Sequence, residues 1–505
     1  MTITDLLHQE VVPAIGCTEP IAVALCVAKA KEELGQEPED IVVRLSKNIY
    51  KNAMAVGIPN TGMTGLPIAI ALGATAGHSA YRLEVLRDVD EAAVAYAKGY
   101  MERTPIRIEV AEDAPDILYI HTLVRAGEAQ AAATIQGTHT HFVERPSCDC
   151  LTAEADRPLT LTDHATHCQT EIVSDTKSIG QQSAQSETLL PSLRTVWEYA
   201  MSVDLGEVAW LHEGAEMNIR AAETSFRGNY GHGLGRLLHN ARKLSNDSPT
   251  ANADRSLTLT DHASRCRTDI EPIHNQSLSE AVGQQTGRSA KRSDSEAVGQ
   301  QNCQIGDVFG DTLFTKILSY TCGACDARMS GAMVQVMSNS GSGNQGISCS
   351  VPVYLYAKER SCSREQTLRA LTLSNLTVVY IKQSLGRLSA LCGCVVAATG
   401  SAVGITYLMG GGYEEITYAI KNMIANISGM ICDGAKPGCA LKVTSGVGTA
   451  ILSASLAMQH SYANASEGIV EEDIDRTIHN LTRIGHDGMT QTDDLILDIM
   501  THKEI

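Results

Sequence analysis

GMICDGAKPGCA, residues 429–440, carries Cys432 and Cys439 with six residues between them in a nearly uncharged region. The glycines and the proline between the two cysteines break both helix and strand, so this stretch forms a turn. A third cysteine, Cys392, lies upstream in LSALCGCVVAATG (388–400) and must come from a different helix. Thiolates gathered in an apolar pocket, outside a disulfide-bonded setting, are what an iron–sulfur cluster requires. Three cysteines leave one iron of a [4Fe–4S] cluster without a thiolate, and an open iron is a Lewis acid.

The size and charge of the chain limit the partners that it can bind. A chain of 505 residues can form two or three domains and bury a large core. Its formal net charge of -18 argues against nucleic acid and against an anionic membrane, because either partner would need clustered Lys and Arg. We therefore expect a small-molecule substrate, no nucleic acid and no membrane as partners, with a homo-oligomer left open.

The first residues, MTITDLLHQE, have neither the basic start nor the apolar stretch of a signal peptide. Fifteen cysteines in a chain this long also differ from the pattern of a small secreted domain. We expect a cytoplasmic protein with reduced thiols. Residues 388–413 are uncharged and long enough to span a bilayer, for which about 20 apolar residues suffice. Their abundant small residues, and the lack of an aromatic belt, favour a buried helix instead.

The order of predicted elements indicates an α+β fold, with an N-terminal α/β domain followed by a mostly helical, cluster-binding domain. A helical pattern runs from Asp5 to Gly35 with Thr18 as the expected N-cap. Strand patterns follow in four segments: 41–46, 106–111, 117–127 and 129–137. Beyond about Asp311, apolar helical periodicity dominates in five segments: 364–385, 388–409, 414–430, 443–459 and 468–484.

Two segments of the chain differ in composition from the rest. Residues 152–172, TAEADRPLTLTDHATHCQTEI, recur at 250–270 as TANADRSLTLTDHASRCRTDI. Both copies are isolated and rich in Ser, Thr and charge, so we interpret them as surface inserts rather than stacked repeats. Each copy has an H-x3-C pair, which could form a zinc site, although duplication explains the recurrence equally well.

The domain organisation that follows from this interpretation has five parts: an N-terminal α/β domain at 1–146, a low-complexity insert at 147–188, a continuation of the core domain at 189–247, a repeat insert at 248–304 and a helical iron–sulfur domain at 305–505.

Two polar stretches suit an anion: the first suits the carboxylate of an amino acid, and the second a carboxylate or a phosphate. SKNIYKN (46–52) follows a strand directly, and an ordinary solvated helix start is its alternative. SNSGSGNQG (338–346) is a Gly-rich loop whose backbone N–H groups can cradle an anion, with a simple loop as the alternative. The candidate substrate-binding residues in these stretches are Ser46, Asn48, Asn52, Ser338, Asn339 and Asn344.

Further along, CGACDARM (322–329) contains a C-x2-C that we interpret as two cysteines packed as small hydrophobes. Asp326 and Arg328 in the same segment suggest a buried, oriented charged unit.

Several motifs in fixed order resemble the L-cysteine desulfidase family of UPF0597 type, which is related to the alpha subunit of iron–sulfur-dependent L-serine dehydratases. The motifs are GCTEP (16–20), SKNIYKNAMAVGIPNTGMTGLPIA (46–69), CDARM (325–329), MSNSGSGNQGI (337–347), LSALC (388–392) and GMICDGAKPGCA (429–440). The resemblance covers most of the chain apart from the two inserts.

The resemblance implies an oxygen-sensitive [4Fe–4S] cluster held by Cys392, Cys432 and Cys439. It also implies a lyase that eliminates the β-substituent of L-cysteine to give pyruvate, ammonia and sulfide. Cys17, in the matching GCTEP, is a further candidate ligand or a catalytic thiolate. Cys394 departs from the usual pattern and is treated as a bystander.

Elimination also needs a base for the Cα proton, and the sequence does not decide between Lys47, Lys51 and Cys17. L-serine dehydration by the same mechanism is one alternative function. A non-catalytic iron–sulfur or zinc-binding protein is the other.

Overall fold

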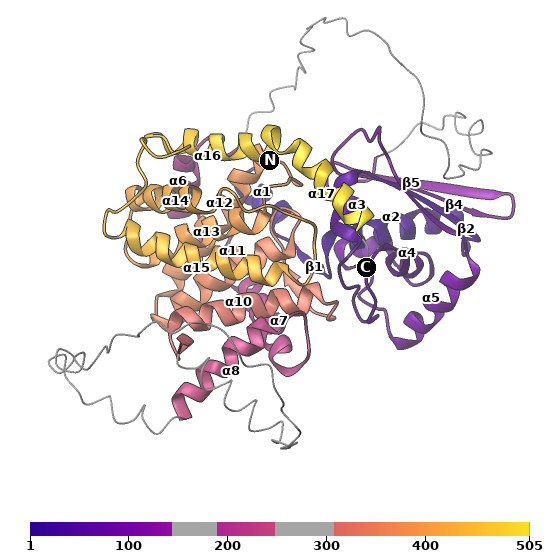
Figure 1. The fold of residues 1–505 in the computed structure, drawn as a ribbon, viewed down its shortest axis with the longest axis horizontal. Coiled ribbons are helices and arrows are strands. Elements are labelled where there is room, and N and C mark those ends of the chain that lie inside the picture. The colour runs from indigo at the N-terminus through magenta and orange to yellow at the C-terminus, as the bar shows by residue number, and fades with distance from the viewer. Residues whose placement is uncertain (144–188, 248–307, 504–505) are drawn as a thin grey trace, which may run out of the picture.

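The computed structural model describes residues 1–143, 189–247 and 308–503, and their apolar side chains form two separate cores (Figure 1). One core belongs to the N-terminal part, in indigo and purple, where helices pack on a sheet. The other lies among the helices that follow, from magenta to yellow. The predicted α+β fold is confirmed. The inserts proposed at 147–188 and 248–304, with their His–Cys pairs, lie outside the described residues.

A four-stranded sheet with the order β3–β2–β4–β5 forms the frame of the N-terminal part. Its strands are β2 (Asp40–Leu45), β3 (Ile106–Val110), β4 (Tyr119–Ala126) and β5 (Ala129–Gln136), and each closely matches a predicted segment. β2 and β3 run parallel, while β4 is antiparallel to both β2 and β5. The alternation of buried and partly exposed residues along β2 explains its strand form, since one face packs on the core.

Helix α2 (Thr18–Leu34) packs across β4 and β5 and against α4 (Leu66–Thr75). Gly73 permits the contact between the two helices, because a Cβ there would lie 2.5 Å from the carbonyl oxygen of Ala24. The remaining elements of this part are α3 (Lys47–Ala53), η1 (Ser79–Glu84) and α5 (Glu91–Arg103).

The single helical pattern expected from Asp5 to Gly35 is wrong, because a strand separates two helices there. α1 (Ile3–Glu10) ends before β1 (Pro13–Ile15), and α2 starts after it. The proline of β1 lacks the N–H that would continue α1, and Gly16 has a φ of +76°, far from helical values. The N-cap of α2 is Cys17 rather than the threonine that follows it.

The helical part has eleven described helices: α6 (Leu193–Ser202), α7 (Trp210–Arg227), α8 (Leu234–Asp247), α10 (Leu313–Met329), α11 (Gly343–Glu359), α12 (Arg364–Leu385), α13 (Gly393–Leu408), α14 (Tyr413–Ile427), α15 (Cys439–Ala457), α16 (Ile474–Arg483) and α17 (Thr490–His502). A short π-helical turn, η3 (Ile484–Gly488), joins the last two. α12 has the predicted bounds. α11 was not predicted as a helix, and it begins inside the Gly-rich stretch 338–346, so only the first half of that stretch is a loop.

Helix α13 lies at the centre of this part and packs against α11, α12, α14 and α15. Its residues from Cys394 to Thr406 are all buried, which confirms the buried helix favoured for 388–413. Glycines allow this packing: a Cβ at Gly400 would lie 2.5 Å from the carbonyl oxygen of Ser374 on α12. Among the helices that the structure describes, α15 alone is long and apolar enough to cross a bilayer by length and composition.

Three contacts join the two parts of the molecule. β1 pairs antiparallel with β6 (Gln335–Met337), so a strand from each part completes a two-stranded sheet. α1 contributes Leu6 and Leu7 to the core of the helical part. α17 crosses from the helical part to α3, as Figure 1 shows in yellow against indigo. The cavity described below lies between the two parts, so these contacts position it.

We expect Gly400→Ala to lower the free energy of unfolding by about 1–3 kcal/mol, because its Cβ would overlap the backbone of α12. Gly448→Ala in α15 is the matched control. Its Cβ would meet nothing closer than the Phe314 ring at 3.6 Å, so a neutral effect or a gain of up to about 1 kcal/mol in helix propensity is expected. Urea unfolding of both variants measures the difference, and equal effects would contradict the close packing of α13.

Candidate active site

The three cysteines predicted to bind a cluster line one cavity of about 80 Å³. Cys392 is the N-cap of α13, Cys432 lies in the loop before α15, and Cys439 is the first residue of α15. Backbone hydrogen bonds hold the first two side by side: Cys392 N donates to the carbonyl oxygen of Met430 at 2.9 Å, and Cys432 N donates to that of Ala390 at 2.7 Å. This antiparallel bridge explains how cysteines far apart in sequence reach one cavity.

The loop between Cys432 and Cys439 is held in place at Asp433 and at Gly434. Asp433 forms ion pairs with Lys436 and Lys442. Burial alone would raise the pKa of Asp433, but these two lysines hold it at about 2. Gly434 has a φ of +86°, and a Cβ there would lie 2.6 Å from the carbonyl oxygen of Lys51. The loop can therefore pack against α3 only with glycine at this position.

The cysteines in this cavity differ in their tendency to ionise. A hydrogen bond with the Cys394 thiol lowers the pKa of Cys392 to about 7, although burial opposes this shift. Burial raises the pKa of Cys432, and it raises that of Cys439 to about 12. Cys394 lines the cavity beside Cys392, so it is a neighbour of the predicted ligands. Cys322 and Cys325 are buried on α10 and do not line the cavity.

No three His, Cys, Asp or Glu side chains of the described residues are arranged so that they could hold a metal ion together. A mononuclear zinc site needs donors converging within about 2.3 Å of one point. In an iron–sulfur cluster each thiolate binds a different iron, so its ligands stand further apart. Three thiols around one cavity, on a bridge and a loop that are both firmly held, fit this second kind of group better than a single ion.

Three further predicted residues also line the cavity: Cys17, Asn52 and Asn344. The thiol of Cys17 donates a hydrogen bond to Glu19 at 3.1 Å. Burial, and then the charge of Glu19, raises the pKa of Cys17 well above its ordinary value. A neutral thiol is therefore favoured at this position, and the roles predicted for Cys17 as ligand or thiolate stay predictions.

Other predicted substrate contacts lie away from the cavity, in structural hydrogen bonds. Ser46 Oγ donates to the carbonyl oxygen of Ile117 at 2.8 Å. Ser338 Oγ donates to the carbonyl oxygen of Val12 at 2.6 Å. The side-chain amide of Asn339 donates to the Asn375 side chain at 2.9 Å.

Neither Asn339 nor Asn48 lines the cavity, and the side-chain oxygen of Asn48 is buried without a hydrogen-bond partner.

The two lysines predicted as candidate bases point to α17 rather than into the cavity. Lys51 is buried, with 1% of its side chain exposed, and forms an ion pair with Asp493. Lys47 is 40% exposed and pairs with Asp494 at 3.2 Å and with Glu112 at 3.3 Å. These contacts give both lysines a structural role, in which they hold α17 against α3. Their assignment as bases stays a prediction.

Arg328 is the most informative residue of the cavity. Its side chain is 1% exposed, and it donates from Nε to the carbonyl oxygen of Gly16 at 3.0 Å and from Nη1 to Oδ1 of Asn344 at 2.9 Å. The third nitrogen, Nη2, is buried without a partner. Asp326 bonds instead to the N–H of Gly235, so the charged unit expected from these two residues does not form.

A buried histidine and a buried lysine in the cavity were missed by the sequence analysis. His139 is 4% exposed, and neither ring nitrogen has a hydrogen-bond partner. Burial, with smaller effects from Arg387 and Arg328, lowers its pKa to about 4 although Glu19 opposes this, so the ring is neutral at neutral pH. Lys382 donates to the carbonyl oxygen of Arg387 at 3.0 Å, and burial lowers its pKa to about 8.

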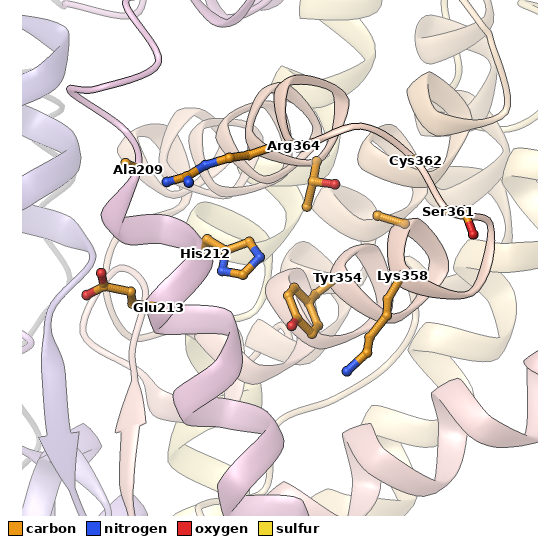
Figure 2. Close-up of a pocket in the computed structure, with 10 residues that line it drawn as sticks. Ala209, His212, Glu213, Tyr354, Lys358, Ser361, Cys362 and Arg364 are labelled. Atoms are coloured by element: carbon orange, nitrogen blue, oxygen red, sulfur yellow. The ribbon is translucent and has the colours of Figure 1, made fainter.

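A separate pocket of about 400 Å³ lies between α7, α11 and the start of α12 (Figure 2). The rings of His212 and Tyr354 lie edge to face, with 5.1 Å between their centroids, and Figure 2 shows Arg364 extending toward Ala209. Cys362 is its one cysteine. This pocket shares no residue with the cysteine-lined cavity. It is therefore not part of the candidate active site, and it serves below as a control site.

Comparison with known proteins gives a consistent picture. The profile of a family described as serine dehydratase alpha chain matches residues 119–498. A UPF0597 protein of Bacteroides fragilis is 48% identical over 501 residues, which cover 99% of this chain and 98% of the relative. A UPF0597 protein of Bacteroides thetaiotaomicron is 47% identical, with 99% and 97% covered, and one of Shewanella pealeana is 36% identical, with 99% and 98% covered.

We expect Asp493→Asn to release α17, because it leaves the ammonium of Lys51 buried without its carboxylate, at a cost of about 3–5 kcal/mol. Asp494→Asn is the matched control. Its partner Lys47 is exposed, so its loss should cost less than about 1 kcal/mol. Hydrogen exchange of the amides in residues 490–502 reads the release directly. Equal exchange in both variants would show that the buried pair does not hold α17.

The lowered pKa of His139 predicts the direction in which the stability of the protein changes with pH. Its folded pKa of about 4 lies below the ordinary 6.5, so between these values the unfolded chain binds the extra proton. Relative to His139→Gln, the wild-type free energy of unfolding should fall as pH drops below about 6.5, by about 1.4 kcal/mol per pH unit at most. Urea unfolding of the metal-free proteins at pH 7, 6 and 5 measures the difference. Parallel pH profiles would place His139 in contact with water.

Proposed function

This chain belongs to the serine dehydratase alpha chain family, and on that premise we propose that it is a [4Fe–4S]-dependent lyase that eliminates the β-substituent of L-cysteine. The products are pyruvate, ammonia and sulfide. The family supports a lyase of the dehydratase type and is generally linked to iron–sulfur serine dehydratases. The choice of L-cysteine follows from the motif resemblance.

The buried guanidinium of Arg328, which has no ion pair among the described residues, is the observation that carries the proposal. A buried charge is costly unless it is paired, and Arg328 has only a carbonyl and an amide oxygen as oxygen partners, with Nη2 left without one. Arg328 lines the same cavity as the three cysteines. An amino-acid carboxylate in the cavity would accept a charge-assisted hydrogen bond from it and remove the unpaired charge.

The cluster would be held by Cys392, Cys432 and Cys439, and when bound it supplies a Lewis acid that polarises the bond to the β-leaving group. The side chains of the cavity bind and orient the substrate. Arg328 binds the carboxylate and so fixes the orientation of the substrate. Asn344, which accepts from Nη1 of Arg328, keeps the guanidinium in place.

His139 is the best-placed base for the Cα proton. One ring nitrogen of a neutral imidazole has a free lone pair, and both nitrogens of His139 are without partners. A pKa of about 4 makes a weak base; burial lowers this pKa most, and the charges of Arg387 and Arg328 lower it further. A bound carboxylate offsets the effect of these positive charges and so raises the pKa of His139. The histidine therefore becomes a better base when substrate is present. Free aminoacrylate then hydrolyses to pyruvate and ammonia.

L-serine dehydration is the second candidate function, favoured by the description of the matching family. Both substrates carry a carboxylate for Arg328 and a β-leaving group. Anaerobically loaded protein, assayed without pyridoxal phosphate, should form pyruvate and ammonia, with sulfide from L-cysteine. A higher kcat/KM for L-cysteine supports the desulfidase, and a higher value for L-serine supports the dehydratase. Pyruvate from neither substrate would exclude both and favour a non-catalytic cluster protein.

We expect Cys432→Ser to lose most of the iron, acid-labile sulfide and activity, because it removes one of three ligands. Cys322→Ser is the control, since Cys322 is fully buried and does not line the cavity. Iron and sulfide analysis after anaerobic purification measures the difference. Full iron content in Cys432→Ser would refute the ligand assignment.

Arg328→Lys and His139→Asn should separate binding from proton transfer. Losing the fork of the guanidinium should raise KM by about 10- to 100-fold, as expected for a hydrogen bond to a charged group. Losing the base should lower kcat by about 10²–10⁴-fold with little change in KM. Both variants should keep their iron. A kcat that is unchanged in His139→Asn would move the base assignment to another cavity residue, such as Lys382.

A further inference from the structure

A second cavity of about 480 Å³ adjoins the cysteine-lined cavity, and we call it the vestibule. It is lined by the end of α1, by η1 and by residues 138–141. Three residues line both cavities: His139, Gly341 and Arg387. The vestibule therefore borders the candidate active site at the proposed base.

An ion pair stands at the boundary between the two cavities. Nη2 of Arg387 lies 2.6 Å from Oε1 of Glu10, and both residues line the vestibule. Gly341 leaves room at the same place: with its φ of +79°, a Cβ there would lie 2.7 Å from Nδ1 of His139 and 3.2 Å from Nη1 of Arg387. The boundary is thus formed by the side chains of His139 and Arg387 packed against a glycine.

The charges along this route suit an anion. Arg82 lines the vestibule, Arg387 lies at the boundary, and Arg328 lies in the inner cavity. Arg82 has an unusual backbone for a non-glycine residue, with a φ of +51°. Of the two acids in the vestibule, Glu10 pairs with Arg387, while Glu84 accepts a hydrogen bond from Gln335 at 2.6 Å.

We propose that the vestibule is the entrance for the substrate, and that Arg387 is the first buried contact of its carboxylate. Glu10 occupies Arg387 until the substrate carboxylate displaces it. From Arg387 the carboxylate passes to the free nitrogen of Arg328, where the proposed function needs it. The inference rests on that function and adds a specificity: compounds with a free carboxylate pass the boundary more readily than their neutral counterparts.

The test uses metal-free protein and two thiol reagents of similar size, anionic iodoacetate and neutral iodoacetamide. Each alkylates a thiolate with loss of iodide. Peptide mass spectrometry gives the rate at Cys392, which is 4% exposed, and at the partly exposed Cys362 in the pocket of Figure 2 as an internal reference. At each cysteine, the rate with iodoacetate is divided by the rate with iodoacetamide. The ratio at Cys392 is then divided by the ratio at Cys362, which gives a normalised ratio.

Glu10→Gln should raise this normalised ratio by about fivefold, because it removes the competing carboxylate from Arg387. Arg387→Met should lower the ratio by a similar factor, and Arg387→Lys should restore part of it. Glu84→Gln is the matched control, since it removes the same charge from the vestibule away from the boundary. Equal effects of Glu10→Gln and Glu84→Gln would overturn the assignment of Arg387 and Glu10. If Arg387→Met does not fold, the comparison of Glu10→Gln with Glu84→Gln still tests the assignment.

Filling the vestibule tests the route itself. Thr138→Trp should slow alkylation of Cys392 by both reagents at least several-fold, while Ala209→Trp, which fills the pocket of Figure 2, should not. Unchanged labelling of Cys392 in Thr138→Trp would show that reagents enter past the Cys432 loop instead. These readouts do not depend on turnover. If the protein lacks lyase activity but shows the ratio changes, the entrance is supported and the proposed function is refuted. If it has lyase activity but shows no ratio changes, the proposed function is supported and the entrance is refuted.

Discussion

The arrangement of the site depends on the hydrogen bonds of one buried group, the guanidinium of Arg328. It joins α10 to α11 through Asn344, 16 positions along the chain, and to the loop before α2 through Gly16, which is 312 positions away. Gly343 makes room for it, because a Cβ there would lie 2.3 Å from Nε of Arg328. Two nitrogens are used to hold the structure together and the third is left free. A buried positive charge without a carboxylate partner destabilises the folded protein. An anion that binds beside it removes this cost.

Both parts of the molecule contribute to the cavity, which explains why they are joined at several points. Cys17 and His139 come from the N-terminal part, whereas Arg328, Lys382, Cys392, Cys432 and Cys439 come from the helical part. The β1–β6 pair fixes the two parts on one side, and the Lys51–Asp493 ion pair fixes α17 on another. Gly434 packs on the backbone of Lys51, so this lysine also supports the cysteine loop.

Local sequence patterns predicted the elements whose structure depends on their own residues. The strands 41–46 and 117–127 and the helix 364–385 follow from periodicity and turn residues within each segment. The proximity of Cys392 to Cys432 was also suggested by composition, although the backbone bridge between them was not. The α+β architecture and the family followed from these patterns and from motifs in fixed order.

The partners of charged residues could not be predicted in this way. Lys51 meets a carboxylate 442 positions away, and Arg387 meets one 377 positions away. His139 lies in a short polar stretch, GTHTH, which has no periodicity and resembles an exposed loop. Gly341 and Arg387, which are distant in sequence, lie against it in the folded chain. A charged residue therefore reveals its role only when distant segments are seen together.

The most direct measurement is an anaerobic crystal structure of the iron-loaded protein with L-alanine, which has the carboxylate and amine of the substrate but no leaving group. The account predicts a cluster bound by Cys392, Cys432 and Cys439, and a carboxylate that accepts a hydrogen bond from Nη2 of Arg328 with Cα facing His139. A carboxylate bound instead at residues 46–52, or a cluster on other cysteines, would contradict it.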